Sequence, residues 1–359
     1  MSPWAPIDRA RRSDERLIVG LMSGMSMDGI DLALARISER DGEPLRPAVE
    51  LVAGDSYPYD DELQDRIRGA LAGDPGAVAA LSAELGERWA KDVVDFLELQ
   101  HVQVEDVVAI GSHGQTIHHT PRQAGARALT VQVGDAARLA AGTGLPVVSD
   151  FRQADIAAGG EGAPLIPLAD WVLFGSPDEV TACQNLGNIA NVTVLPEVLA
   201  DVLAFDTGPA NALIDAAVRS TDAGLEAGGI DRDGTLSAEG QLDDDLLLAL
   251  YTRRSSWMAE KPPKSAGFGT FGPGLLEEVG EAFTRLSLPD RVRTVVEFSA
   301  LVLRDAYAWH VVTRFPELTR VRFSGGGCHN PTLMARIAAM FEDLGLAVEP
   351  LEPAWVDLK

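Results

Sequence analysis

A turn of small residues between two apolar runs constrains the fold of this chain more than any other segment. Residues Leu17–Val19 are typical of a buried strand, and Ile30–Ile37 alternate apolar with other side chains, as a second strand does. The turn between them is rich in glycine and serine, whose backbone and hydroxyl donors can surround phosphate oxygens. These residues alone leave two interpretations open, a phosphate-binding hairpin and an ordinary tight hairpin that needs glycine.

Two acidic residues, Asp28 in the turn and Asp31 near the start of the second predicted strand, restrict what the turn could bind. Carboxylates repel bare phosphate, so they fit a phosphate-binding turn only if Mg²⁺ lies between them and a nucleotide. We therefore expect Asp28 and Asp31 to hold Mg²⁺, directly or through water.

Charge and length exclude several classes of protein. A net charge of −24 over 359 residues argues against nucleic acid and anionic membrane surfaces as partners. The length allows two or three domains with a sizeable core. No apolar run approaches the length of a membrane span, and residues 1–15 lack the apolar stretch of a signal peptide, so we expect a disordered leader.

Cysteine and histidine usage points to a cytoplasmic protein without a structural metal. The only two cysteines, Cys183 and Cys328, are far apart in the sequence, which makes a disulfide framework improbable and a reducing cytoplasm the simple interpretation. Together with the six histidines they form no ligand set at zinc spacing.

Strand-like and helix-like segments alternate along the chain, which predicts α/β layers. The first half contains strands predicted at Val107–Ile110, Leu129–Val133 and Leu145–Val148 and helices predicted at Leu63–Leu71 and Val78–Leu99.

A second hairpin of the same form follows at Thr181–Leu195, with Gly187 and Asn188 in its turn. A strand at Val202–Phe205 then runs into Asp206, and a helix is predicted at Ala212–Ser220. The repeat predicts an N-terminal lobe of residues 16–175 and a C-terminal lobe of residues 176–359, with both glycine turns lining one cleft. Chance similarity of two hairpins is the alternative.

The second lobe ends with a strand, a glycine loop and a helix. A predicted strand at Arg320–Phe323 runs into Gly325, Gly326 and Gly327, and a helix is predicted at Thr332–Leu344. An open α/β sheet binds ligands at this edge, and three glycines leave a flat surface for an adenine or ribose. The alternative is a flexible connection. Further helices are predicted at Leu236–Tyr251, Leu275–Leu286 and Val292–Phe315.

Taken together, these segments resemble the anhydro-N-acetylmuramic acid kinase family, in the acetate/sugar kinase–Hsp70–actin superfamily. The matching segments occur in the family's order and are Gly20–Asp31, Gly111–His119, Val131–Asp135, Ser149–Arg152, Asp155–Gly160, Gly162–Leu165, Asn185–Thr193, Phe205–Asn211, Pro262–Ser265 and Gly325–Asn330. The resemblance implies a two-lobed, actin/sugar-kinase-like α/β fold, in which each lobe is a mixed sheet with helices and the active site lies in the cleft between.

The resemblance also implies an activity. Members hydrolytically open 1,6-anhydro-N-acetylmuramate with ATP and phosphorylate O6, which gives N-acetylmuramate 6-phosphate in the recycling of peptidoglycan. Asp206 stands at the position of the family's catalytic aspartate, where a carboxylate can take the proton of the attacking water. Read without the family, Asp206 followed by Pro209 suits a helix N-cap.

The resemblance assigns ligand-binding residues as well. For the sugar they are His113, Gln115, Arg152, Asn211 and Asp357, with Arg152 suited to pair with the lactyl carboxylate or, alternatively, with Asp150 or Asp155. For the nucleotide they are Gly24, Met25, Ser26, Met27, Asp28, Gly29, Ile30, Asp31, Gly187, Asn188, Lys264, Gly325, Gly326 and Gly327, with Asp28 and Asp31 on Mg²⁺.

Several positions depart from the family pattern, namely Met25, Glu161, Asn188 and Phe268-Gly269, and the chain ends before a final helix of the family. They leave two alternatives open, a truncated or degenerate non-catalytic relative that binds nucleotide or sugar, and an ordinary sugar hydroxyl kinase. The expected partners are ATP and a small amino sugar, with neither nucleic acid nor membrane. The sequence leaves the oligomeric state open, a homodimer included.

Overall fold

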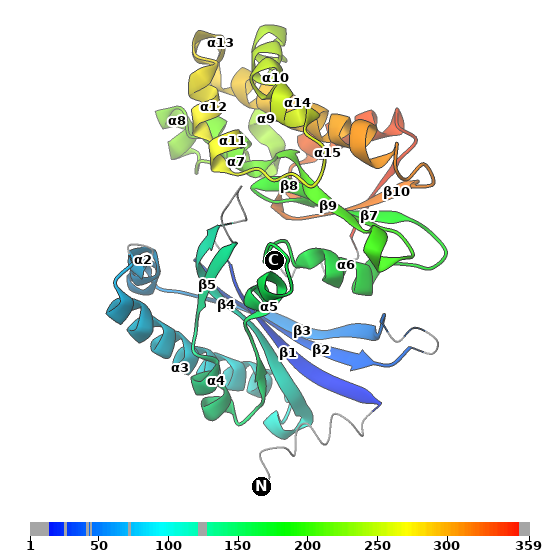
Figure 1. Ribbon diagram of the computed structural model, residues 1–359. Coiled ribbons are helices and arrows are strands. Elements are labelled where there is room, and N and C mark those ends of the chain that lie inside the picture. The colour runs from blue at the N-terminus through cyan, green and yellow to red at the C-terminus, as the bar shows by residue number, and fades with distance from the viewer. Residues whose placement is uncertain are drawn as a thin grey trace. The chain divides into compact units, whose positions relative to one another are not determined.

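The chain forms two α/β units, each with its own sheet (Figure 1). The structure is a computed structural model and describes residues 14–24, 27–40, 43, 45–70, 73–120 and 128–351. Unit 1 comprises the described residues up to Leu173, and unit 2 those from Phe174. The predicted α/β class is confirmed. Residues 1–13 of the expected leader and the predicted site residues Met25, Ser26 and Asp357 lie outside the described residues, whereas the expectation is wrong at Glu15, the last residue of the expected leader, because Glu15 begins β1.

Unit 1 is built on a mixed sheet with the strand order β3-β2-β1-β4-β5, and β6 pairs with β4. The β1–β2 pair is an antiparallel hairpin, while β1 and β4 run parallel, with Val19 opposite Ile110. The strands are β1 (Glu15–Ser23), β2 (Gly29–Ser38), β3 (Ala48–Pro58), β4 (Val107–Thr120), β5 (Leu129–Val133) and β6 (Val147–Val148).

The core of unit 1 lies between the sheet and helices α2, α3 and α4, and Figure 1 shows α3 and α4 side by side along it. Ile30, Leu32 and Leu34 alternate along β2 toward this core and are fully buried. The helices are α2 (Asp61–Ala70), α3 (Pro75–Leu99), α4 (Ala136–Thr143), α5 (Phe151–Ala157) and α6 (Ile166–Phe174).

Unit 2 is built on a second mixed sheet, of strand order β11-β10-β7-β8-β9. Here β7 and β8 form an antiparallel hairpin, β9 continues antiparallel, and β10 pairs parallel to both β7 and β11. The strands are β7 (Thr181–Leu186), β8 (Ile189–Leu195), β9 (Leu203–Pro209), β10 (Arg320–Ser324) and β11 (Ala347–Pro350).

The helices of unit 2 pack around α14, whose inward face is fully buried from Val292 to Leu303 and which continues into a π turn at Tyr307–Val311. None of the helices in the described residues is long and apolar enough to cross a bilayer. The helices are α7 (Asn211–Val218), α8 (Asp222–Glu226), α9 (Thr235–Glu239), α10 (Asp244–Ala259), α11 (Phe268–Phe271), α12 (Pro273–Glu278), α13 (Glu281–Thr284), α14 (Leu288–Ala306) and α15 (Pro331–Glu342).

Two predicted helices are wrong because the structure has two shorter helices in the place of each. The segment 236–251 divides into α9 and α10, since α9 ends at Glu239, before the extended Gly240, and the Asp243 carboxylate accepts from Leu246 N to begin α10. The segment 275–286 divides into α12 and α13 at Gly280, whose φ of 51° no α-helix contains.

Candidate functional site

A buried hydrogen-bond network supports the turn that follows β1. Ser23 Oγ lies 2.6 Å from Gln115 Oε1 and 3.1 Å from the Gly29 carbonyl oxygen, the two acceptors for its proton. Tyr59 Oη is 3.0 Å from Ser23 Oγ and accepts from Trp89 Nε1 at 2.9 Å, so the tyrosine is left to donate to the serine. The network fixes the start of the turn to β4 and α3.

Gln115 is part of this network, whereas the sequence placed it at the sugar. Its side chain is fully buried, and Nε2 donates to the carbonyl oxygens of Gly24 at 3.0 Å and Thr116 at 3.2 Å. Both amide hydrogens are therefore engaged within unit 1. In this structure Gln115 holds the backbone of the turn, and its role at the sugar stays a prediction.

The turn itself is closed by its own backbone. Met27 N donates to Gly24 O at 3.2 Å, with Met27 in the left-handed region at φ 58° and its side chain buried. Gly29 is required by sterics, because a Cβ there would lie 2.6 Å from Tyr57 O on β3. The side chains of Met27 and Ile30 belong to the core, so only their backbone can serve the predicted nucleotide role.

The two carboxylates predicted to hold Mg²⁺ differ in their surroundings. Asp28 is exposed at the start of β2, whereas Asp31 lies on the strand face opposite Ile30 and accepts from Ser56 Oγ at 2.5 Å. No group of three or more potential metal ligands exists in the described ranges. A pair of carboxylates suits Mg²⁺ that arrives on a nucleotide, since this ion keeps most of its ligands as phosphate oxygens and waters.

A second polar cluster in unit 1 joins His113 to Arg152. Arg152 Nε donates to His113 Nε2 at 2.9 Å, so the ring proton lies on Nδ1, which donates to Gly114 O at 2.8 Å. Burial lowers the pKa of His113, and the Arg152 charge lowers it further, against the opposing effect of the Gly114 bond. His113 is therefore a neutral imidazole held in one orientation.

Arg152 also shapes the loop that follows α5. Its Nη1 donates to Gly162 O at 2.7 Å, while Asp155 Oδ2 accepts from Gly162 N at 2.7 Å. Arg152 and Asp155 thus both bond to the backbone of Gly162, one at its carbonyl and the other at its amide. These bonds give both side chains a role in the loop that does not depend on an ion pair between them. Burial lowers the pKa of Arg152, and its charge in turn lowers the pKa of His119, after the larger effect of burial there.

In unit 2, Asp206 lies within β9, because this strand continues to Pro209. The N-cap alternative is wrong, since α7 begins after Ala210 and has no side-chain cap. Asp206 Oδ2 accepts from Ala266 N at 2.8 Å, and Asp206 N donates to Lys264 O at 3.1 Å. Burial raises the pKa of the Asp206 carboxyl above its usual range, and the bond from Ala266 N opposes this in part.

The turn of the second hairpin is joined to the start of α7. The Gly187 carbonyl accepts from Asn211 N at 3.0 Å, and the Asn188 carbonyl accepts from Ala212 N at 3.1 Å. Asn211 Nδ2 donates to Leu186 O at 3.2 Å. The predicted sugar ligand Asn211 thus lies with the second hairpin and the glycine loop, among residues predicted to bind the nucleotide.

The glycine loop after β10 packs against the end of β7. Gly325 has φ 89°, and a Cβ there would lie 2.3 Å from Asn185 Oδ1; at Gly327 it would lie 2.8 Å from Leu186 Cβ. Gly326 is exposed, and its nearest neighbour would be Asn211 Nδ2 at 3.5 Å. Two glycines are therefore needed for packing, and Gly326 is the one that presents bare backbone to solvent.

Lys264, predicted to bind the nucleotide, lies at the end of α10. It is 8% exposed and donates from Nζ to Met258 O at 3.0 Å and Trp257 O at 3.3 Å. Its nucleotide role stays a prediction.

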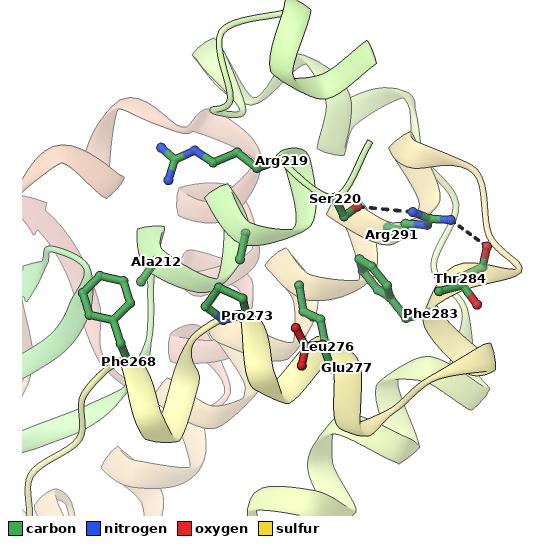
Figure 2. Close-up of a pocket in the computed structure, with 11 residues that line it drawn as sticks. Ala212, Arg219, Ser220, Phe268, Pro273, Leu276, Glu277, Phe283, Thr284 and Arg291 are labelled. Atoms are coloured by element: carbon green, nitrogen blue, oxygen red, sulfur yellow. Dashed lines mark hydrogen bonds between the residues drawn. The ribbon is translucent and has the colours of Figure 1, made fainter. Parts of the chain in front are cut away.

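A pocket of about 410 Å³ lies within unit 2, against α7 (Figure 2). Phe268 lies beside Ala212 at one end, and Arg291 lies beside Phe283 at the other. Phe268, one of the departures from the family pattern, therefore lines this pocket with its largely exposed ring.

Sequence reasoning missed Ser23, Tyr59 and Trp89 as supports of the first turn. Ser23 lies within the segment Gly20–Asp31 that matches the family, so the sequence offered its hydroxyl as a candidate. Tyr59 and Trp89 lie on segments with no motif, and only the folded chain brings them to the serine.

Comparisons with known proteins agree on one family. The family model for anhydro-N-acetylmuramic acid kinase matches residues 16–352. The anhydro-N-acetylmuramic acid kinase of Caldanaerobacter subterraneus is 36% identical over 340 residues, covering 92% of this chain and 84% of the relative. That of Xanthomonas oryzae pv. oryzae is 39% identical over 341 residues, covering 94% and 85%. That of Bacillus cereus is 34% identical over 337 residues, covering 92% and 86%.

Among solved structures, an activator of 2-hydroxyisocaproyl-CoA dehydratase from Clostridium difficile with bound ADPNP matches with a TM-score of 0.38 at 13% identity, covering 96% of this chain and 90% of that one. The ROK hexokinase from Thermus thermophilus matches with a TM-score of 0.33 at 15% identity, covering 96% of both.

Proposed function

This chain belongs to the anhydro-N-acetylmuramic acid kinase family, and from that membership we propose its reaction. It is a phosphotransferase that opens the ring of 1,6-anhydro-N-acetylmuramate and phosphorylates O6, giving N-acetylmuramate 6-phosphate and ADP. The observation that carries the proposal is the family match across residues 16–352. A non-catalytic relative and an ordinary hydroxyl kinase are not favoured by it.

The chemistry needs a base because water is a poor nucleophile. The water oxygen bonds to C1 as the C1–O6 bond breaks, and O6 bonds to the γ-phosphorus as the bond to the ADP oxygen breaks. We assign the water proton to the carboxylate of Asp206. Burial raises its pKa, which makes it a better proton acceptor, and the bond from Ala266 N fixes Oδ2, so Oδ1 is the oxygen proposed to face the water.

ATP and Mg²⁺ are the proposed co-substrate and metal. Phosphoryl transfer relies on positioning and charge neutralisation more than on covalent chemistry. In unit 1 the backbone from Gly24 to Gly29 and the carboxylate of Asp28 would serve the phosphates and Mg²⁺, with Asp31 acting through water. In unit 2 the turn at Gly187 and the exposed Gly326 would serve the nucleotide. Bound Mg²⁺ would neutralise charge on the transferring phosphoryl group.

Arg152 is the proposed ligand of the lactyl carboxylate. Its guanidinium keeps a charge at every physiological pH, and it lies beside neutral His113, so the cluster attracts an anion without a competing acid in direct contact with the imidazole. His113 positions Arg152 in this proposal.

The proposed compartment is the cytoplasm, where ATP is available and the free thiols of Cys183 and Cys328 stay reduced. A homodimer remains an expectation, which sedimentation of the purified chain would test.

Incubation with ATP, Mg²⁺ and ¹⁸O-labelled water tests the reaction. Mass spectrometry of a panel of anhydro and ordinary amino sugars should show phosphorylation of the anhydro sugar only, with label at C1 in the earliest product. Early product without ¹⁸O would contradict water attack, and phosphorylation of ordinary sugars alone would support the hydroxyl kinase instead.

Asp206→Asn tests the base. The substitution keeps the shape and an acceptor for Ala266 N, so turnover should fall about a hundredfold or more while ATP binding is retained. Full activity of this variant would contradict the assignment.

A further inference from the structure

The segment Lys264–Ala266 touches Asp206 at two points. Its first carbonyl accepts from Asp206 N, and its last amide donates to Asp206 Oδ2 at 2.8 Å. The orientation of the carboxylate therefore depends on where this short segment lies.

The segment is in turn attached to the C-terminal end of α10 by two side chains. Lys264 Nζ donates to the carbonyls of Trp257 and Met258, and the ammonium group lies over the Trp257 ring, 4.1 Å from its centre. Trp257 Nε1 donates back to Ser265 O at 3.0 Å. A cation at the carbonyl end of a helix, above an aromatic face, is favourably placed on both counts.

Among the described residues, the Lys264 ammonium group interacts electrostatically with Glu260 and His310. Burial lowers the pKa of Lys264 to about 8, which Glu260 opposes, and His310 lies close enough for Lys264 to lower its pKa further after burial. The pKa shift of Asp206 has two causes, burial and the Ala266 bond, both from uncharged surroundings. The connection that the structure shows between Lys264 and Asp206 runs through the backbone of the segment, by the bonds from Asp206 N to Lys264 O and from Ala266 N to Asp206 Oδ2.

We propose that Lys264 is a positioning residue for Asp206: it fixes the segment Lys264–Ala266 to α10, so that Ala266 N holds Oδ2 of the carboxylate. This inference rests on the proposed role of Asp206 as the base, and it replaces the expectation that Lys264 binds the nucleotide.

The test follows the amide proton of Ala266 by NMR in the full chain labelled with ¹⁵N-alanine. In the wild type this resonance should shift with pH as Asp206 ionises, and in Asp206→Asn the shift should vanish. In Lys264→Met the amplitude should fall by more than half. The kcat should fall on the order of tenfold or more, because the carboxylate is misplaced, while Kd for Mg²⁺·ATP stays within about twofold.

Lys261→Met is the matched control, since the same substitution at an exposed neighbour should leave titration and turnover unchanged. Trp257→Phe is the second probe should Lys264→Met fail to fold; it removes the Ser265 bond and should reduce the amplitude in the same direction. A full Ala266 titration in these variants, or Mg²⁺·ATP affinity weakened tenfold with kcat retained, would overturn the proposal. A wild type that shows the titration but no turnover would overturn the proposed function and leave the positioning in place.

Discussion

At the scale of single residues, the Ser23 hydroxyl contributes to stability through its contacts with Gln115, Tyr59 and the Gly29 carbonyl. In Ser23→Ala, Gln115 Oε1 and Tyr59 Oη lose a buried partner, so the free energy of unfolding should fall by about 1–3 kcal/mol. Urea denaturation measures this. Ser255→Ala, at an exposed serine on α10, should change stability by no more than about 0.5 kcal/mol, and equal losses in both variants would contradict the network.

Lys264 gives a stability that depends on pH. Its pKa is about 8 in the folded protein, below the ordinary 10.5, so between these values the unfolded chain holds more protons than the folded one. Stability attributable to Lys264 therefore rises as pH increases through this window. Urea midpoints at pH 7 and pH 10 should show the wild type gaining relative to Lys264→Met. A constant difference between the two proteins would contradict the shifted pKa.

At the scale of elements, the glycine loop after β10 offers a matched pair of substitutions. Gly325→Ala forces a Cβ at φ 89° to within 2.3 Å of Asn185 Oδ1, so stability should fall by about 1 kcal/mol or more. Gly326→Ala meets only an ordinary contact at 3.5 Å, so the fold should be retained. Thermal melting compares the two. If Gly326 contacts the nucleotide as proposed, its variant should bind ATP more weakly despite normal stability.

Elements with a strong apolar pattern were predictable, and their ends were not. The strands β1 and β2 bury alternate residues, whereas β7 and β8 bury residues on both faces over most of their length, and the apolar residues of all four made these strands predictable. By contrast, β3 buries no residue and carries no such pattern, so only its pairing with β2 reveals it. β4 continues beyond the predicted Val107–Ile110 to Thr120. Its later part contains buried polar residues such as Ser112, Gln115 and Thr116, which an apolar pattern does not reveal.

At the scale of the whole molecule, ordered motifs predicted the family and the division into two sheets. The expectation of one shared cleft stays a prediction. Within the candidate site, Asp206 was singled out by the family resemblance, whereas the donor that holds its carboxylate, Ala266 N, comes from a segment 60 residues later. Pairings over such distances follow from the fold and leave no local pattern in the sequence.

Binding of Mg²⁺·ATP should stabilise the chain by mass action, because the ligand binds only the folded state. At a hundredfold excess over Kd, the gain is about 2.7 kcal/mol, which thermal melting detects as a rise in Tm. Asp28→Asn removes the exposed carboxylate proposed to bind Mg²⁺ and should reduce the rise in Tm, whereas Asp61→Asn, at another exposed aspartate of unit 1, should leave it unchanged.

Excess EDTA should also reduce the rise in Tm of the wild type, since the nucleotide then meets the acidic turn without its metal. A Tm that does not change across millimolar Mg²⁺·ATP would count against nucleotide binding altogether. An equal rise with and without EDTA would keep ATP as a ligand and remove Mg²⁺ and Asp28 from the proposal.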